Sequence, residues 1–325
     1  MKWNLVKTIY KDGNTGRFGT SVDLYGNYLA VGARGSEKSY VFERRNDGDW
    51  HEIKSFTKSG VTEYGYRVSI FGNYVAVGSK GNYAFSYRRK NNGEWEEIFS
   101  NNGGNDYGRD VGVYGNYMVV GSRKKVHFYE LNINGNWEEK QIIHGDRNNF
   151  GRSVYIYKNY MMVGDHSDSE GKVHFYERKN GNWEKIQSIE NSSENFGWDI
   201  SIYGNYALVG TKNENKTHWY IRDSGSGEWR ENHTVNEVGT DEFGRSVSVH
   251  GNYAIVGDTG SASEKGFWYR RNATGDWELT NTESPPISGR GDFGDSVSIY
   301  GNYAVVSGDG SKPVHEGGLA IYEYY

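Results

Sequence analysis

The residues best suited to chemistry in this chain are arginines that recur at one position of a repeated pattern. An arginine follows an aromatic-Gly pair three times and a tryptophan follows it once, at Arg109, Arg152, Arg245 and Trp198. Guanidinium groups gathered in this way would present planar donor forks, which suit a carboxylate, sulfate or phosphate. The same arginines could instead pair with nearby acids such as Asp110 or Asp199. An anion site and internal ion pairs therefore both stay open.

Polar loops of unequal length supply a second group of candidates. Their acidic and imidazole side chains are Asp165, His166, Asp168, Asp258 and Asp309. Variable loops on a rigid scaffold often carry binding sites. The run 165–170 holds several oxygen donors, but its spacing matches no standard calcium loop, and a solvated turn is the expected structure. We expect these loops to contact a ligand, with no metal ion and no cofactor.

Motifs of the common catalytic mechanisms are absent from the sequence. It contains no Gly-x-Ser-x-Gly, no His-Glu-x-x-His and no phosphate-binding glycine loop. It also contains no cysteine, which excludes disulfides and cysteine-based zinc sites. We assign no catalytic residue and expect no enzyme, although a composite site built from several repeats stays open.

These candidates belong to seven copies of one sequence unit. The aromatic-Gly pairs begin at Phe18, Tyr64, Tyr107, Phe150, Phe196, Phe243 and Phe293, at spacings of 43 to 50 residues. Eight residues after each aromatic comes Gly-Asn-Tyr, except that the fourth copy reads Lys158-Asn159-Tyr160. Each unit divides into an alternating strand, a tight Gly-Asn hairpin turn, a second strand, a polar loop, an aromatic third strand and a fourth strand opened by Trp. Four strands in 43–50 residues is the size of a β-propeller blade.

The two ends of the chain complement each other. The seventh unit stops after its third strand, and Trp3 to Ile9 matches the fourth strand of another unit, Trp183 to Ile189. We therefore predict an all-β, seven-bladed β-propeller with four antiparallel strands per blade, as a single domain over 1–325. Residues 3–10 supply the outer strand of the last blade and close the ring. The blades begin near residues 18, 64, 107, 150, 196, 243 and 293.

Two repeated aromatic positions could be mistaken for sites. The Trp that opens the fourth strand could serve as a sugar-stacking platform, but its presence in every blade favours packing between blades. His127, His174 and His218 share one position of the third strand, which other blades fill with Tyr40, Phe85 and Phe267. Equivalent positions of different blades lie too far apart to share a metal ion, so we expect packing there as well.

Composition narrows the possible partners. The net charge is -5 with both signs mixed along the chain, which gives no basic field for nucleic acid. No stretch approaches the eighteen apolar residues of a membrane span, and no signal peptide is visible at the N-terminus. Four Asn-x-Ser/Thr sequons are present, at Asn191, Asn215, Asn232 and Asn272.

The repeat resembles the FG-GAP β-propellers, the family that includes the ligand-binding head of integrin α subunits. The resemblance covers essentially the whole chain and rests on segments such as Phe150 to Ile156 followed by Met161 to Gly164. It is closest to bacterial-type repeats without the calcium loop, as in 40–44, Tyr-Val-Phe-Glu-Arg. The family implies extracellular or surface recognition and adhesion, with ligands on the face formed by the loops between strands two and three and between blades. The family's acidic calcium loop is replaced here by Gly-Asn, so calcium binding is not carried over.

We therefore expect a non-catalytic recognition or adhesion module that binds a protein or a glycan, in a lectin-like manner, through this face. A structural subunit of a larger surface or virion assembly is the alternative. A propeller enzyme with a composite site over the channel is the third possibility.

Overall fold

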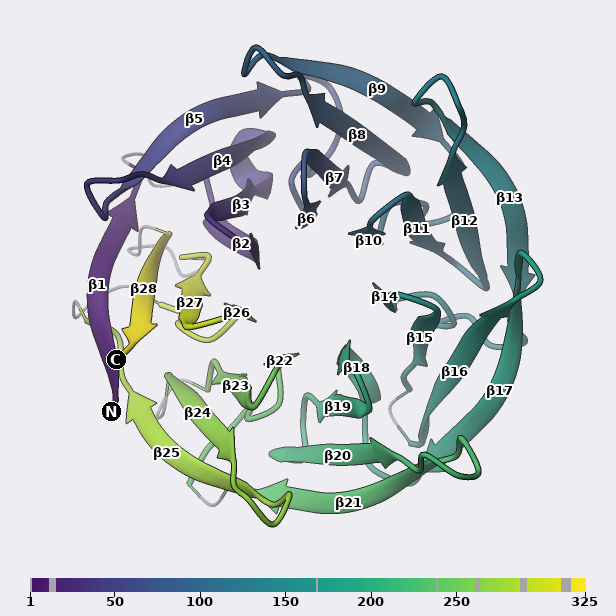
Figure 1. The fold of residues 1–325 in the computed structure, drawn as a ribbon, viewed down its shortest axis with the longest axis vertical. Coiled ribbons are helices and arrows are strands. Elements are labelled where there is room, and N and C mark those ends of the chain that lie inside the picture. The colour runs from purple at the N-terminus through teal and green to yellow at the C-terminus, as the bar shows by residue number, and fades with distance from the viewer. Residues whose placement is uncertain are drawn as a thin grey trace.

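The computed structural model describes residues 2–11, 16–167, 169–237, 239–260, 264–286, 291–310 and 317–325. These residues form seven four-stranded antiparallel sheets arranged as blades around a central axis (Figure 1). The predicted fold is therefore confirmed.

The strands are numbered along the chain, from the innermost to the outermost strand of each blade. Blade 1 holds β2 (Phe18–Tyr25), β3 (Tyr28–Ala33), β4 (Lys38–Arg44) and β5 (Trp50–Thr57), with a short 3-10 helix η1 (Arg34–Ser36) after β3. Blade 2 holds β6 (Arg67–Phe71), β7 (Tyr74–Gly78), β8 (Tyr83–Arg89) and β9 (Trp95–Asn102). Blade 3 holds β10 (Asp110–Tyr114), β11 (Tyr117–Ser122), β12 (Lys125–Leu131) and β13 (Trp137–His144). Blade 4 holds β14 (Ser153–Tyr157), β15 (Tyr160–Asp165), β16 (Gly171–Lys179) and β17 (Asn182–Asn191).

The remaining blades follow the same plan. Blade 5 holds β18 (Phe196–Tyr203), β19 (Tyr206–Thr211), β20 (Lys216–Arg222) and β21 (Trp229–Asn236). Blade 6 holds β22 (Ser246–His250), β23 (Tyr253–Asp258), β24 (Lys265–Arg271) and β25 (Trp277–Glu283). Blade 7 holds β26 (Ser296–Tyr300), β27 (Tyr303–Gly308) and β28 (Gly318–Tyr324), and its outer strand is β1 (Trp3–Tyr10) from the other end of the chain.

The pairing of β1 with β28 closes the ring as predicted. Its register runs antiparallel from Trp3 opposite Tyr324 to Tyr10 opposite Gly318. The two termini therefore lie side by side in one blade (Figure 1). This arrangement leaves blade 7 with the same four strands as the other blades.

The inner hairpins have the predicted tight turns. The turn glycines have a positive φ, such as 58° at Gly115, and Lys158 adopts 54° at the same position of blade 4. Lysine in this left-handed region is strained, because its Cβ approaches the following carbonyl oxygen.

Packing between blades holds the aromatic residues of the repeat. The aromatic of each aromatic-Gly pair is buried, with Tyr64 and Tyr107 both 0% exposed. The Trp at the start of each outer strand contacts a ring of the preceding blade, as Trp183 contacts Phe128 at 5.5 Å. The other six pairs are Trp3–Tyr253, Trp50–Tyr303, Trp95–Phe56, Trp137–Tyr74, Trp229–Tyr160 and Trp277–Tyr206. The packing interpretation of these tryptophans is therefore confirmed.

The inner strands of neighbouring blades are joined by side chains. Backbone N–H groups on the edge of one inner strand donate to a Ser or Asp of the preceding blade, so that few are left unpaired. In the layer nearer the strand starts, Val154 N–H donates to Asp110 at 2.7 Å and Val68 N–H to the Ser21 hydroxyl at 3.1 Å. In the next layer, Ile70 N–H donates to Asp23 at 2.8 Å. The polar half of the alternating pattern in these strands therefore fastens the blades together.

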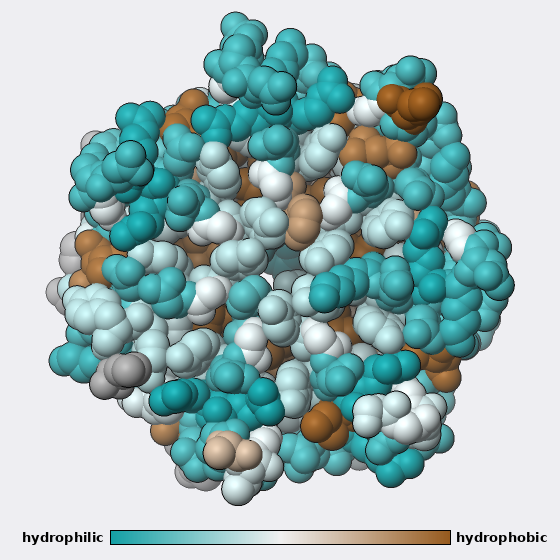
Figure 2. Space-filling view, in the orientation of Figure 1, coloured by the Kyte–Doolittle hydropathy of each residue, from teal (hydrophilic) through white to brown (hydrophobic). Residues whose placement is uncertain are grey.

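A closed ring of aromatic side chains, here called the collar, surrounds the axis where the inner strands end. Its members precede the hairpin turns: Tyr25, Phe71, Tyr114, Tyr157, Tyr203, His250 and Tyr300. Each ring contacts the next, with centroid separations from 4.3 to 5.1 Å. A space-filling view down the axis shows a narrow central opening in a largely hydrophilic face (Figure 2).

Candidate functional site

A cavity of about 320 Å³ runs along the axis between the seven inner strands. At one end lies the collar. The other end opens where the inner strands begin, on the face that carries the loops between second and third strands. We call this opening the mouth.

Two repeat positions supply the side chains of the mouth. The first column is the residue that follows each aromatic-Gly pair: Thr20, Tyr66, Arg109, Arg152, Trp198, Arg245 and Asp295. The second column lies just beyond the end of each second strand: Arg34, Lys80, Arg123, His166, Lys212, Thr259 and Asp309. Seven of these side chains are Lys or Arg and two are Asp. The mouth therefore gathers positive charge in a chain whose net charge is negative.

Tyr66 lies at the centre of one group of cations. The guanidinium carbons of Arg34 and Arg109 lie 5.4 and 5.6 Å from its ring centroid, and the Lys80 nitrogen lies at 4.8 Å. Arg67, on β6, lies at 5.3 Å. Burial works to raise the pKa of the Tyr66 phenol, but the positive charges of these four residues outweigh it, and the pKa is lowered. The local field thus favours negative charge.

Trp198 organises the opposite part of the mouth. Lys212 and Arg245 lie 4.7 and 5.6 Å from its ring centroid, and the His166 ring lies at 4.7 Å. The pKa of His166 is lowered to about 4 by burial and by the charge of Arg152, so this imidazole is neutral near pH 7. Trp198 and Tyr66 are thus two aromatic surfaces with cations beside them.

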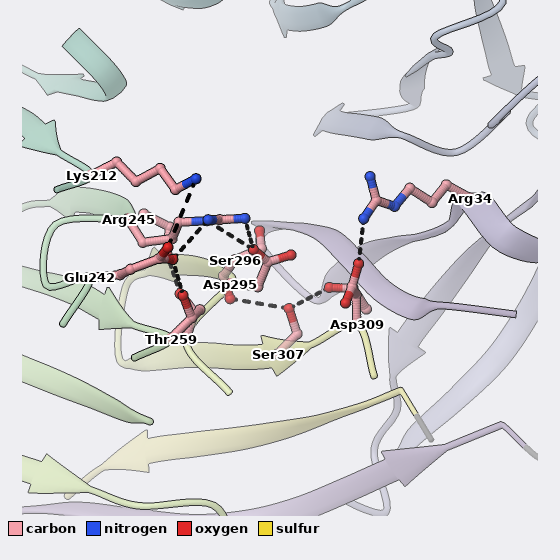
Figure 3. A network of polar contacts seen from close by, with 12 residues as sticks. Arg34, Lys212, Glu242, Arg245, Thr259, Asp295, Ser296, Ser307 and Asp309 are labelled. Atoms are coloured by element: carbon pink, nitrogen blue, oxygen red, sulfur yellow. Dashed lines mark hydrogen bonds and ion pairs between the residues drawn. The ribbon is translucent and has the colours of Figure 1, made fainter. Parts of the chain in front are cut away.

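Several of the mouth cations form ion pairs with carboxylates, as Figure 3 shows for blades 1, 6 and 7. Arg34 contacts Asp309 at 2.8 Å. Arg245 contacts both Glu242 and Asp295 at 2.8 Å. For Arg245 the ion-pair interpretation is therefore the one that holds.

Arg109 and Arg152 differ from these residues. Among the described residues, neither forms an ion pair, and the Arg152 Nε is shielded from solvent without a hydrogen-bond acceptor. Asp110 lies 3.7 Å from Arg67, and Asp199 accepts a hydrogen bond from Val247 N–H at 2.7 Å. The acids that sequence analysis offered as partners are thus engaged elsewhere.

Of the nine predicted ligand-binding residues, Trp198 and Arg245 line the cavity. Arg109, His166 and Asp309 contact the lining residues Tyr66, Trp198 and Arg34. Arg152 occupies the same repeat position as Arg109 in the next blade. Two acids have structural contacts. Asp165 is buried with its Oδ2 4.0 Å from His174 Nε2. Asp258 accepts hydrogen bonds from the N–H groups of Glu242 and Gly260, both at 3.0 Å. Asp168 lies outside the described residues.

Sequence analysis missed Tyr66, Arg67 and the cations of the second column, chiefly Arg34, Lys80 and Lys212. Tyr66 occupies the same repeat position as Arg109, but one tyrosine in a chain with 27 of them does not by itself indicate a site. The second column could have been found by aligning the residues that follow the Val-Gly end of each second strand. Side-chain contacts between the two columns could not have been read from spacing.

The histidines of the third strands pack as predicted. His127, His174 and His218 contact the rings of Tyr107, Phe150 and Phe196 at 5.0, 5.3 and 5.1 Å. Among the described residues, no group of three His, Cys, Asp or Glu side chains could hold a metal ion. In the same part of the chain, no helix is long and apolar enough to cross a membrane.

Comparisons with known proteins support the fold. A family model described as the LVIVD repeat matches residues 197–215 and 244–261, in blades 5 and 6. The β-propeller domain of Cps50 (Swd1) from Myceliophteria thermophila superposes with a TM-score of 0.72 at 11% identity, over 100% of both chains. A putative 6-phosphogluconolactonase from Bacteroides fragilis gives a TM-score of 0.63 at 11% identity, covering 82% of this chain and 84% of that chain. No curated protein matches the sequence. The matched repeat family is thus LVIVD, and the resemblance to FG-GAP repeats rests on the motifs alone.

Proposed function

We propose that this chain is a non-catalytic recognition module that binds a protein or a glycan through the face around the mouth. The observation that carries this proposal is the grouping of two partly exposed aromatic side chains, Tyr66 and Trp198, with cations from six blades at one opening. Aromatic and Arg side chains are enriched in the energetically dominant parts of binding interfaces, and loops on a rigid scaffold are where such sites occur.

The polar contacts at the mouth favour binding over catalysis. Asp309 pairs with Arg34 at 2.8 Å, and Asp295 pairs with Arg245 at the same distance. A general base needs a free lone pair directed at the proton that it removes, whereas these carboxylates face guanidinium groups. The FG-GAP-like motifs point the same way, and with them we propose an adhesive role outside the cell or at its surface.

The proposal is tested by binding of the purified chain to a glycan array and to candidate surface proteins, with and without a chelator. We expect saturable binding that the chelator does not change. Tyr66→Ala and Trp198→Ala should each weaken it at least tenfold, because each removes a large contact surface at the centre of the site.

The matched control is Ile133→Ala. Ile133 is 101% exposed in the hairpin between β12 and β13, on the face opposite to the mouth. If binding survives in both mouth variants but is lost in Ile133→Ala, the site lies on the face opposite to the mouth, and the proposal is wrong. Turnover of a substrate by the wild-type chain would contradict the non-catalytic part.

A further inference from the structure

The balance of charge around the mouth is uneven from blade to blade. In blades 2, 3 and 6 the residue before the repeat aromatic is an acid, and it pairs with a second-column cation. Glu63 contacts Lys80 at 3.0 Å, Asp106 contacts Arg123 at 3.4 Å, and Glu242 contacts Lys212 at 3.8 Å. Glu63 and Asp106 thus offset cations of their own blades, and Glu242 offsets Lys212 of the preceding blade.

Blades 1, 4 and 5 carry no acid at this position, which holds Arg17, Asn149 and Asn195. In blade 4 the Asn149 amide nitrogen donates to the His166 carbonyl oxygen at 2.8 Å. An asparagine brings no charge, so Arg152 is left without a carboxylate. In blade 3 the single acid at this position, Asp106, faces Arg123, and Arg109 is left without one as well. Among the described residues, the two first-column arginines without an ion pair therefore lie on adjacent blades, 3 and 4.

Arg109 and Arg152 occupy the same repeat position in adjacent blades, at the start of the inner strands β10 and β14. The pKa of Arg152 is lowered first by burial and then by the charge of Arg109. Both arginines also act to lower the pKa of the neighbouring His166, which stays neutral and leaves the two guanidinium groups as the charged groups there. Two guanidinium groups on adjacent blades without ion pairs among the described residues, one of them with a shielded Nε atom that lacks an acceptor, would be stabilised by a shared anionic partner.

The flanking aromatic side chains define the shape of that partner. Tyr66 lies 5.6 Å from the Arg109 guanidinium carbon, and Trp198 contacts His166 on the other side of Arg152. The site would therefore suit a compact oxyanion attached to a flat or ring-shaped group. The oxyanion would accept hydrogen bonds from the arginines, and the attached group would contact the aromatic side chains.

We propose that Arg109 and Arg152, flanked by Tyr66 and His166, form an oxyanion-binding site, and that the ligand of the recognition face carries a carboxylate, sulfate or phosphate at this point. The proposal about the ligand rests on the function proposed above. The proposal of an oxyanion-binding site concerns the chain alone and can be tested without knowing the ligand.

Isothermal titration of the full chain with sodium sulfate, phosphate and acetate at low chloride tests the site. We expect at least one of these ions to bind to a single site when the chloride concentration is below the physiological one. Arg109→Gln and Arg152→Gln should each weaken binding about tenfold, because each removes a charge-assisted donor fork, and the double variant should abolish it. The relative affinities of the three ions identify the oxyanion.

The matched control is Arg230→Gln, which makes the same change in net charge on an outer strand, where Arg230 pairs with Glu228 at 2.9 Å. Its affinity should equal that of the wild type. Should Arg109→Gln or Arg152→Gln unfold, Arg109→Lys and Arg152→Lys keep the charge and remove only the fork, and weaker binding is again expected. No binding by the wild type, or equal binding by all variants, would overturn the site.

A sulfated oligosaccharide, its desulfated form and an acidic peptide then separate possible sources of the oxyanion. The chain should bind the sulfated oligosaccharide or the peptide more tightly than the desulfated form. Loss of this preference in Arg109→Gln would support the proposal that the ligand of the recognition face carries the oxyanion. Array or protein binding that is unaffected by the two arginine variants would leave the recognition function standing and remove the oxyanion from it. Ion binding by a chain that binds neither glycan nor protein would leave the site standing and remove the recognition function.

Discussion

The glycine that precedes each first-column residue of the mouth should tolerate no side chain, and Gly108, immediately before Arg109, provides the sharpest test. Gly108 has a φ of 83°, and a Cβ there would lie 2.0 Å from the carbonyl oxygen of Tyr83 in the preceding blade. Gly115, at the hairpin turn of the same strand, has a φ of 58° and nothing within 4 Å of an added Cβ. The two positions share a left-handed backbone and differ in how closely another blade approaches.

Alanine at Gly115 should therefore cost only the left-handed conformation, about 1 kcal/mol. Alanine at Gly108 should cost the same amount plus the displacement of a neighbouring backbone, for a total of about 3 kcal/mol or more. Equilibrium unfolding in urea measures both losses as shifts of the midpoint at unchanged slope. Equal shifts for the two variants would refute the reasoning, because they would show that close approach of blades 2 and 3 plays no part.

Three further predictions concern single side chains. Lys158→Gly should raise stability by about 0.5–1 kcal/mol, since Lys158 holds a φ of 54° where the other blades carry glycine, and a lower urea midpoint would contradict this. Trp229→Ala should cost about 3–5 kcal/mol, because Trp229 is 1% exposed against Phe175 of blade 4, and Trp229→Phe should recover part of the loss. Burial raises the pKa of Asp110 from 3.8 to about 7, so the folded chain keeps a proton that the unfolded chain releases between about pH 4 and pH 7. The stability that this proton supplies is present below about pH 4 and is lost as the pH rises to about 7. The urea midpoint of Asp110→Asn should therefore fall less steeply across that range than the midpoint of the wild type. An equally steep fall would contradict the raised pKa of Asp110.

The fold could be predicted from sequence because each of its determinants is local or repeated. The Gly-Asn turns determine the hairpins, the aromatic-Gly pairs determine the repeat length, and Trp3 identifies the displaced outer strand. Register details were less accessible. In every blade the pairing of the third strand with the outer strand is shifted by a bulge, as between Phe175 and Tyr176 opposite β17. A bulge depends on how the whole strand twists, and no single residue type marks it.

The site was only partly predictable, for a physical reason. Repeat alignment placed Arg109, Arg152 and Arg245 at one opening, but whether each is paired depends on residues elsewhere in the chain. Arg245 meets Asp295 from the next blade, and Arg109 meets no such acid among the described residues. Ion pairing is a property of contacts between blades, and seven copies of one motif differ in those contacts even where the motif itself is the same.

The alternation within the inner strands explains how one short segment can hold the ring together and leave its first residue free for the proposed site. Its apolar side chains, such as Val154, pack between blades, while Ser and Asp at the positions directly before and after this valine in other blades accept the N–H groups of the next blade. Asp110, for example, accepts from Val154 N–H at 2.7 Å. With these tasks met inside the channel, the first residue after the aromatic-Gly pair is not needed for closure. Thr, Tyr, Arg, Trp and Asp all occur there. A position that varies among the blades is thus one that lies at the mouth, so the charge of the mouth can change without loss of the contacts that close the ring.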